Sequence, residues 1–416
     1  MAFSLSHAAH LFSDFEQDDR TVLDIDDFKS EIIDWNRFGT ATVCSNYEDI
    51  PVFINEFWTS KQRAAHSLHE ISYRACFKPQ LPRFFITRLT KKNDSVFDPF
   101  MGRGTTLLEA ALHGRQAAGN DVNPLSRMLV EARLTPPTLQ EIQKRLSQID
   151  LSKRAEYRHD LEVFFHPNTL AEICALKTYF IDKGQLDNID LWIRMVALNR
   201  LTGHSKGFFS VYTLPPNQAT SIASQIKINV KRKQNPDYRD TKSLILKKSQ
   251  ALLKQALPDE TAHTNSQFLN CDLNKDRLEV KKQVQLSVTS PPFLNIVNYK
   301  EDNWLRCWFA DIDAAAIQIT QTPKLRIWKE LMHRTLVSVA RNTVPGGYFA
   351  FEVGEIQKGD LRLEETVIKA AEGTIWKPKF ILINQQNFTK TSNAWGVANN
   401  RKGTNTNRIV LFKREG

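Results

Sequence analysis

Short apolar runs and amphipathic stretches alternate in two parts of the chain, which lie before and after a long middle segment. Apolar runs bounded by turn residues predict strands at 95–97, 117–121, 266–271, 284–289 and 348–353. Apolar residues at helical spacing predict helices at 105–114, which ends at Gly114, and at 324–342. A last pair of strands is predicted at 379–386 and 407–413. Because the first strand, helix and second strand read as one parallel crossover unit, the pattern predicts an α/β fold.

The alternation stops between about residues 135 and 264, where the apolar spacing is mostly helical. A structureless loop of that length is implausible, so we expect a helical insertion at 135–265. The first residues carry an acidic patch followed by Ile32, Ile33 and Trp35, which predicts an N-terminal helical extension at 1–60. Residues 61–134 and 266–416 are then expected to form one α/β domain.

Composition narrows the class of protein. The 416 residues are 41% hydrophobic, with a net charge of +10, which favours an anionic partner such as nucleic acid. The five cysteines are scattered without a CxxC pair, so they predict neither a zinc site nor a disulfide framework. The chain shows no signal peptide and no run of about 18 apolar residues. We therefore expect a soluble, cytoplasmic protein without metal and without membrane association.

The run Asp98-Pro-Phe-Met-Gly-Arg-Gly-Thr-Thr follows the first predicted strand. In doubly wound sheets, ligands bind beyond the carboxyl ends of the strands. Gly102 and Gly104 allow the backbone to approach a ligand closely, and Thr105 opens a helix whose N–H groups favour an anion. The arrangement fits a zwitterionic amino-acid group, with its ammonium toward Asp98. The run lacks the third glycine of a dinucleotide-binding motif and is not a phosphate loop.

Two further acids follow predicted strands. Asp121 ends the second strand, where it is placed to accept hydrogen bonds from ribose hydroxyls. Asp272 follows the strand near 267–271, where it is placed to accept from an adenine amino group.

The run Thr-Ser-Pro-Pro-Phe at 289–293 ends another predicted strand. The lone pair of an aromatic amine is delocalised, and hydrogen-bond acceptors help its nitrogen to attack. Ser290 Oγ and the Pro291 carbonyl are such acceptors, since Pro291 and Pro292 fix the backbone. Phe293 supplies a face on which an extruded base stacks.

Together, the segments 96–106 and 289–293 resemble the signature motifs of S-adenosylmethionine (AdoMet) dependent DNA amino-methyltransferases. The resemblance covers roughly 60–135 and 266–413. It implies a Rossmann-like class I methyltransferase sheet, mostly parallel with an antiparallel C-terminal hairpin strand, and AdoMet as cofactor. It assigns Asp98, Pro99, Phe100 and the two glycines to the cofactor site. Phe77-Lys78-Pro79 resembles a further cofactor motif that includes Lys78, although a helix-capping proline looks the same.

The order of motifs differs from the permuted class that is common among cytosine-N4 enzymes. Ser290 nevertheless favours cytosine N4, because adenine enzymes more often carry Asp or Asn there. We therefore predict a site-specific DNA methyltransferase that acts on an amino group of a flipped base, preferably cytosine N4. The alternatives are an adenine-N6 enzyme, an RNA base methyltransferase, and a catalytically silent DNA-binding protein on the same scaffold.

Two basic segments are the candidates for contact with double-stranded DNA. Residues 221–256 carry nine Lys or Arg against two Asp and include Lys231, Arg232 and Lys233. A solvated helix face is the alternative for this segment. The second segment, 395–408, includes Asn400, Arg401 and Lys402, and a plain hairpin connection is its alternative. Restriction-modification, a common setting of the family, implies a separately encoded restriction endonuclease as partner.

Overall fold

The computed structural model describes most of the chain. The described residues are 21–58, 65–74, 76–152, 158–255, 257–258, 265–292, 299–317, 322, 324–354, 362–389 and 402–416. Nine strands of this described part form one mixed sheet in the order β1-β2-β8-β9-β7-β6-β3-β4-β5. They are β1 (Val43–Tyr47), β2 (Ile50–Asn55), β3 (Ser95–Asp98), β4 (Gln116–Asn120), β5 (Gln267–Leu269), β6 (Val284–Thr289), β7 (Thr343–Gly354), β8 (Trp376–Thr389) and β9 (Lys402–Arg414).

Most neighbouring strands run parallel. β2 is parallel to β8, and β7, β6, β3, β4 and β5 are parallel to one another in turn. β9 is antiparallel to both of its neighbours, β7 and β8. The predicted α/β fold, with a mostly parallel sheet and an antiparallel C-terminal strand, is confirmed. From the central strand β3 the chain goes first to β4 on one side and later to β6 on the other, so a topological switch point lies between β3 and β6.

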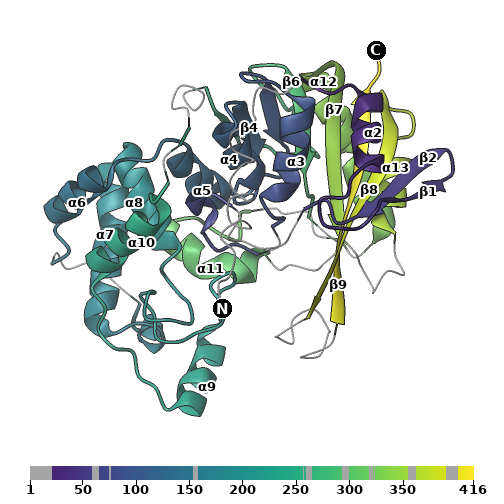
Figure 1. The fold of residues 1–416 in the computed structure, drawn as a ribbon. Helices are drawn as coiled ribbons and strands as arrows, with labels where there is room; N and C mark the ends of the chain where they lie inside the picture. The colour runs from purple at the N-terminus through teal and green to yellow at the C-terminus, as the bar shows by residue number, and fades with distance from the viewer. Residues whose placement is uncertain are drawn as a thin grey trace, which may run out of the picture.

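Helices cover both faces of the sheet (Figure 1). Those of the sheet domain are α2 (Ile25–Ile33), α3 (Gln80–Leu89), α4 (Thr105–Leu112), α5 (Pro124–Leu134), α11 (Tyr299–Ala310), α12 (Leu325–Asn342) and α13 (Leu363–Ala371). Alternate residues of a strand point to opposite faces, which β7 shows clearly. Tyr348 and Ala350 join the apolar cluster of α3 and α4, whereas Phe349 and Phe351 join that of α12 and α13. Burial on both faces explains why these strands read as apolar runs.

The segment between α5 and β5 is a group of helices beside the β5 edge of the sheet (Figure 1). They are α6 (Leu139–Gln148), the short 3-10 helix η4 (His159–Val163), α7 (Pro167–Lys183), α8 (Asn188–Leu198), α9 (Ile222–Arg232) and α10 (Thr241–Leu252). Trp192 and Ile193 of α8 belong to the same apolar cluster as Leu129 and Val130 of α5. The helical segment therefore shares one hydrophobic core with the sheet domain.

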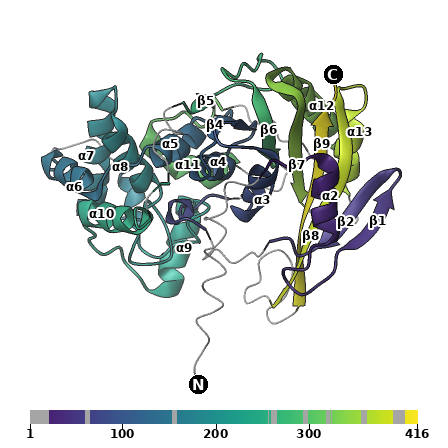
Figure 2. The ribbon, with the colours of Figure 1, turned by 45° about the horizontal axis from the view of Figure 1, so that its top comes forward.

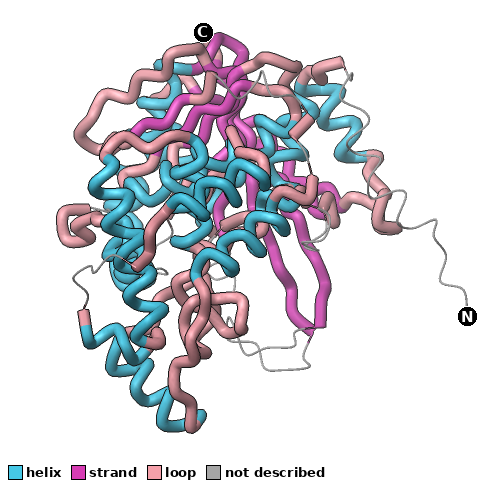
Figure 3. Tube along the Cα trace, turned by 90° about the vertical axis from the view of Figure 1, so that its left-hand side faces the viewer, coloured by secondary structure: helices cyan, strands magenta, loops and turns pink. Residues whose placement is uncertain are grey.

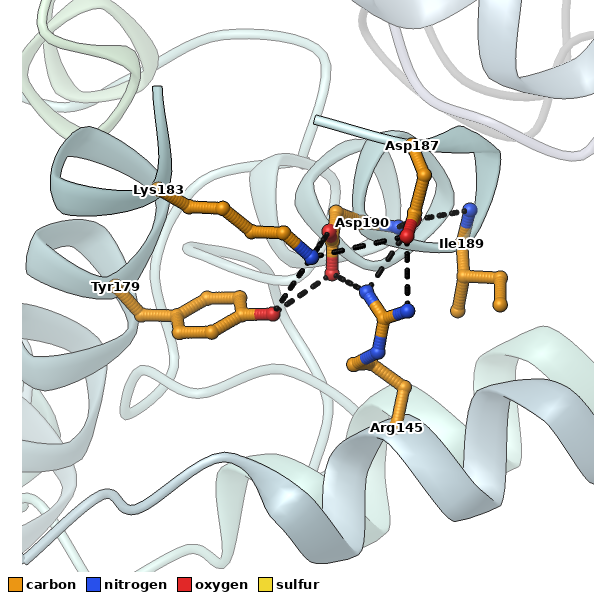
Figure 4. A network of polar contacts seen from close by, with 6 residues as sticks. All are labelled: Arg145, Tyr179, Lys183, Asp187, Ile189 and Asp190. Carbon is orange, nitrogen blue, oxygen red and sulfur yellow. Dashed lines mark hydrogen bonds and ion pairs between the residues drawn. The ribbon is translucent and has the colours of Figure 1, made fainter. Parts of the chain in front are cut away.

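A polar network joins α6, α7 and α8 (Figure 4). Its centre is the fully buried carboxylate of Asp190, which accepts hydrogen bonds from Arg145 (2.5 Å), Tyr179 (3.0 Å) and Lys183. Asp187 caps α8 and also binds Arg145 at 2.8 Å. That hydrogen bond is the main reason why the pKa of Asp187 is held well below its usual value. One ion network thus fixes the relative positions of three helices.

The N-terminal segment differs from the predicted helical extension at 1–60. Residues 25–33 form α2 as the pattern suggests, but 43–55 contain the strands β1 and β2. β2 adds to the sheet by pairing in parallel with β8, and Asn384 of β8 accepts hydrogen bonds from the N–H groups of Phe57 and Trp58. Residues 1–20 lie outside the described part. The prediction was wrong for 43–55 because the partner that makes this segment a strand lies more than 300 residues away.

The far ends of β8 and β9 extend beyond the helical layers, as the long strand pair in Figure 3 shows. Helix α9 projects on the same side, separated from these strands in Figures 1 and 2. The parallel strands also end on this side, because β7, which is antiparallel to β9, runs toward it. The projecting elements therefore flank the side on which strand-end ligands bind.

Candidate active site

One pocket opens at the carboxyl ends of β3, β4, β5 and β6. Together with the open space at its mouth, it encloses about 900 Å³. Its walls combine aromatic and aliphatic side chains with three carboxyl groups. The lining residues are Tyr73, Cys76, Phe77, Asp98, Phe100, Met101, Gly102, Thr105, Asn120, Asp121, Val122, Asn123, Cys271, Asp272, Leu273, Asn274, Ser290, Pro292 and Leu331.

Asp98 joins the two sequence motifs at the floor of the pocket. Its Oδ1 accepts hydrogen bonds from the N–H of Phe100 (3.0 Å) and from the hydroxyl of Thr289 (2.6 Å), the last residue of β6. A second link runs from Thr106 Oγ1 to the Val288 carbonyl. Burial raises the pKa of the Asp98 carboxyl to about 7, although the hydrogen bond from Thr289 lowers it. The cofactor motif and the proline motif therefore share one hydrogen-bonded base.

The glycine loop is held by the next strand. Asp121 follows β4 and accepts hydrogen bonds from the N–H groups of Gly102 (2.9 Å) and Asn123 (2.8 Å). Burial raises the pKa of Asp121 in spite of these bonds. Gly104 has a φ of 73°, and a Cβ there would lie 2.3 Å from Val130 of α5. Only glycine therefore allows α4 to start this close to α5.

Buried hydrogen bonds bring the segment before α3 to the pocket. Glu109 of α4 binds Arg83 of α3 and His69, at 2.8 and 2.7 Å. Burial raises the pKa of Glu109, but these partners and His113 hold it well below its usual value. Arg103 of the glycine loop donates to the Ile71 carbonyl at 2.9 Å. Tyr73 thereby reaches the pocket although no strand precedes it.

Asn120, the last residue of β4, ties three strand ends together. Its side-chain amide donates to the carbonyls of Pro99 and Cys271, at 3.2 and 3.1 Å, and its oxygen accepts from the Cys271 N–H at 2.8 Å. Asp272, the residue after Cys271, accepts a hydrogen bond from the N–H of Asn274 at 3.0 Å and lines the pocket. The acid that was predicted to meet an adenine is thus oriented by its own loop.

The proline loop is fixed from two sides. The Trp328 indole of α12 donates to the Pro292 carbonyl at 2.9 Å. On the other side, the Ser290 hydroxyl forms a hydrogen bond with Glu352 of β7, which also accepts from Asn407 of β9 at 3.1 Å. Burial raises the pKa of Glu352, against these hydrogen bonds. A buried carboxyl group therefore stands directly behind Ser290.

Comparison with known proteins finds similarity to one family in the N-terminal part of the chain. Residues 23–126 match the family model described as DNA methylase. Type II methyltransferase M.MvaI of Kocuria varians is 31% identical over 139 residues, 33% of this chain and 27% of that protein. Type II methyltransferase M.MjaII of Methanocaldococcus jannaschii is 34% identical over 104 residues, 25% of this chain and 19% of that protein. The resemblance to the DNA amino-methyltransferases is confirmed.

The matches span only about a quarter of one curated relative and a fifth of the other. Among solved structures, TrmN from Thermus thermophilus aligns with a TM-score of 0.31 at 10% identity, covering 84% of this chain and 51% of that chain. The rRNA methyltransferase aviRa from Streptomyces viridochromogenes aligns with a TM-score of 0.31 at 11% identity, covering 83% of this chain and 89% of that chain. Likeness at this level does not bear on the function.

AdoMet, the cofactor that this family implies, fits the pocket. Carboxyl groups stand at three neighbouring strand ends, where an ammonium, a ribose and an adenine amino group each need an acceptor. Phe77, Phe100 and Leu331 supply apolar walls for the rest of such a molecule. Among the described residues, no group of three or more His, Cys, Asp or Glu side chains is placed to hold a metal ion. No helix in the described ranges is long and apolar enough to cross a membrane.

The structure brings most of the predicted site residues together. Those that line the pocket are Asp98, Phe100, Gly102, Thr105, Asp121, Asp272, Ser290 and Pro292. Lys78, Pro99, Gly104 and Pro291 do not line it, although they shape the loops around it. Lys78 is half-buried at the start of α3, where burial lowers its pKa. Phe293 lies outside the described residues.

Sequence reasoning missed four residues that the geometry singles out. They are Tyr73, Asn120, Thr289 and Glu352. Glu352 left a signal, since it is a lone carboxylate within the apolar run of β7. Tyr73 left none, because buried hydrogen bonds of the preceding segment position it rather than a motif.

The predicted DNA contacts are only partly described. Lys231 and Arg232 end α9, and Lys233 follows in a left-handed conformation, with all three side chains exposed. The guanidinium of Arg232 lies 3.8 Å from the centre of the Tyr212 ring. Asn400 and Arg401 lie outside the described residues, as does the side chain of Lys402 at the start of β9.

Proposed function

We propose that this protein transfers a methyl group from AdoMet to an exocyclic amino group of a flipped DNA base, with cytosine N4 as the preferred target. The observation that carries the proposal is the shared pocket of Asp98 and Ser290, which Thr289 links at the floor. A single cavity thus offers a cofactor acceptor and an amine acceptor on adjacent strands.

The cofactor contacts follow from the three strand ends. Asp98 would hold the ammonium of the methionine part, Asp121 the ribose hydroxyls and Asp272 the adenine amino group. Gly102 and Thr105 would let the carboxylate approach the start of α4. When bound, AdoMet supplies a sulfonium whose methyl group is strongly electrophilic, so no covalent nucleophile of the protein is required.

Ser290 would accept a hydrogen bond from the target amine while its own proton points to Glu352. This donation fixes the hydroxyl, so the lone pairs of Oγ are left for the amino group. As the amino nitrogen gains the methyl group and the C–S bond breaks, the nitrogen becomes cationic and must lose one proton. Glu352, with its raised pKa, would take this proton through Ser290.

The pocket favours a base that has left the duplex. An amino group inside a base stack cannot reach a recessed acceptor, so such enzymes extrude the base. The basic surface of α9 would hold the flanking double-stranded DNA by its phosphates. Ser290 favours cytosine N4, and adenine N6 is the runner-up.

The decisive experiment identifies the methylated nucleoside. Purified protein is incubated with labelled AdoMet and either duplex DNA or RNA, and the digested nucleosides are identified by mass spectrometry. We expect N4-methylcytosine from DNA. N6-methyladenine would replace the assignment of the base, label in RNA alone would replace the substrate, and AdoMet binding without transfer would favour the silent scaffold.

Two variants test the roles of the residues. Ser290→Ala is expected to lower kcat about a hundredfold with unchanged AdoMet affinity, since it removes one preorganised group. The exposed Ser30→Ala on α2 is the matched control and should leave kcat unchanged. Glu352→Gln should lower kcat and abolish the fall of kcat at low pH. The KM for AdoMet should stay at the wild-type value. Full activity in Ser290→Ala would contradict the proposal.

A separately encoded restriction endonuclease and a cytoplasmic location stay predictions. Both curated relatives are called Type II methyltransferases, which supports a restriction-modification setting.

A further inference from the structure

Helix α9 exposes two large apolar side chains and buries two polar ones, fully or in part. Gln225 is fully buried and Asn229 half-buried, whereas Ile226 is 47% exposed and Val230 73% exposed. Surface helices normally bury the apolar stripe and present the polar one. Because Ile226 and Val230 are four residues apart, they lie next to each other on one outward face.

The inward face of α9 is held by hydrogen bonds. Gln225 donates to the Tyr212 carbonyl at 3.0 Å and to Asn229 at 2.7 Å. Asn229 donates to the Val163 carbonyl at 2.7 Å, and Gln234 donates to the Tyr212 carbonyl at 2.9 Å. These bonds place the helix and leave its outward valine and isoleucine to face solvent. Apolar side chains that face solvent in this way are typical of a helix that binds a partner with its outward face.

The charge around this face identifies the chemistry of the partner. Lys227 and Lys231 are exposed on α9 near the two apolar residues, and Arg232 and Lys233 are exposed at the end of the helix. No carboxylate occurs between residues 217 and 236. A helix with this charge complements a polyanion, and duplex DNA has a major groove about 12 Å wide that admits one α-helix.

The position of α9 agrees with that partner. The helix projects on the side of the molecule where the parallel strands end and the pocket opens, opposite the extended ends of β8 and β9 (Figures 1 and 2). A duplex that delivers a flipped base to the pocket would pass along this side. Apolar side chains in the major groove have one distinctive contact, the 5-methyl group of thymine.

We propose that α9 enters the major groove of the substrate DNA and that Ile226 and Val230 recognise thymine by contact with its methyl group. Lys227 and Lys231 bind the adjacent phosphates and supply affinity without reading sequence. The proposal rests on the proposed function only for the identity of the substrate as DNA. It assigns one part of the sequence specificity to two side chains.

The test measures DNA binding, so its result does not depend on whether the protein transfers a methyl group. Duplexes that the full-length protein prefers are selected from a pool with randomised central positions. Each preferred thymine is then replaced by deoxyuridine, which lacks only the methyl group. We expect wild-type affinity to fall about fourfold at one or two positions, the effect of one buried methyl group. The Ile226→Ala, Val230→Ala double variant should bind both versions equally.

Matched controls separate this effect from general damage. Val43→Ala replaces a valine that is 60% exposed on the edge strand β1 and should keep the sensitivity to deoxyuridine. Lys227→Gln with Lys231→Gln should weaken binding to all duplexes and reduce the salt dependence of log Kd by about two units, while keeping that sensitivity.

Several outcomes would overturn the proposal. Wild-type binding that ignores every thymine-to-deoxyuridine change would do so, as would a double variant that keeps the sensitivity. Loss of self-association in the double variant by sedimentation velocity, with DNA binding unchanged, would assign this face to a second copy of the chain. Methyl transfer without DNA discrimination at α9 would leave the proposed function standing and remove only this inference.

Discussion

Asp98 sets the acid limit of the site. It is buried, its pKa is raised to about 7, and it accepts a hydrogen bond from Thr289. A carboxyl group with this pKa is ionised above neutrality and protonated below it, and only the ionised form attracts an ammonium. A single buried acid thus links cofactor binding to pH near the neutral range.

We predict that AdoMet affinity falls as pH drops below 7. Between pH 7.5 and 5.5, Kd should rise about twentyfold, because protonation of Asp98 removes the charge that holds the ammonium. Titration calorimetry at a series of pH values measures this dependence. The Asp98→Asn variant should bind AdoMet weakly at all pH values, without the rise of Kd at low pH. A pH-independent Kd in the wild type would refute the role of Asp98.

Gly104 is a structural requirement of the cofactor loop. Gly104→Ala should lower the free energy of unfolding by about 3 kcal/mol, since a left-handed backbone and a 2.3 Å clash with Val130 add together. Gly114 has a similar φ of 71° with only Lys92 at ordinary contact distance. Gly114→Ala should therefore cost only about 1–2 kcal/mol. Urea denaturation of both variants measures the difference, and equal losses would rule out the clash.

The residues of the site differ in how far the sequence could reveal them. Asp98 ends its strand, and Asp121 and Ser290 directly follow theirs. Local apolar runs already mark these strands, so the strand-end rule finds all three residues. Tyr73 enters the pocket because Glu109 and Arg103 hold the preceding segment, and no spacing along the chain encodes such contacts. Gly104 stays a predicted cofactor residue, and the structure adds that it allows α4 to pack against α5.

At the scale of elements, the network around Asp190 fixes α6, α7 and α8 by charge as well as by apolar packing. Breaking a buried ion pair leaves charges without their partner and is costly. Arg145 and Lys183 are partly exposed, so water offsets part of that cost.

Asp190→Asn should destabilise the protein by about 1–3 kcal/mol. The amide keeps the shape of the side chain but removes the charge that three donors share. Asp182→Asn, an exposed change on α7, is the control and should be close to neutral. Thermal unfolding followed by circular dichroism measures both, and a neutral Asp190→Asn would show that apolar packing alone holds these helices.

Elements with local signals were predictable and those with distant partners were not. β3, β6 and β7 are apolar runs that helices bury on both faces, and their pattern predicts them without knowledge of their neighbours. β1 and β2 are short, partly exposed and dependent on β8 for a partner, so the same pattern left them unrecognised.

At the scale of the whole molecule, the helical segment and the sheet domain share a core. Leu129 and Val130 of α5 are buried in the same cluster as Trp192 and Ile193 of α8, and the Trp192 indole donates to Ser249 of α10 at 2.9 Å. The region predicted as an insertion therefore shields apolar surface that the sheet domain cannot cover by itself.

Replacing residues 139–252 by a short linker should abolish cooperative unfolding. The outward face of α5 would lose its cover, and an exposed apolar face of this kind promotes aggregation. Urea titration followed by tryptophan fluorescence, with dye binding to exposed apolar surface, measures the effect. A shortened chain that unfolds in one sharp transition would show that the helices are dispensable for the fold.

The site depends on the pairing of β3 with β6, which matches Val96 with Leu286 and Phe97 with Ser287. The segment between these two strands is long, and the register is the pairing of the strands themselves. Helix α2 and the end of β9 lie near each other in Figures 1 and 2. A gene joined at those ends and opened between β4 and β6 would encode the same two strand ends in the reverse order. In such a rearranged chain the two motifs would meet through the same strand pairing, so the chemistry of the site would not depend on their order along the chain.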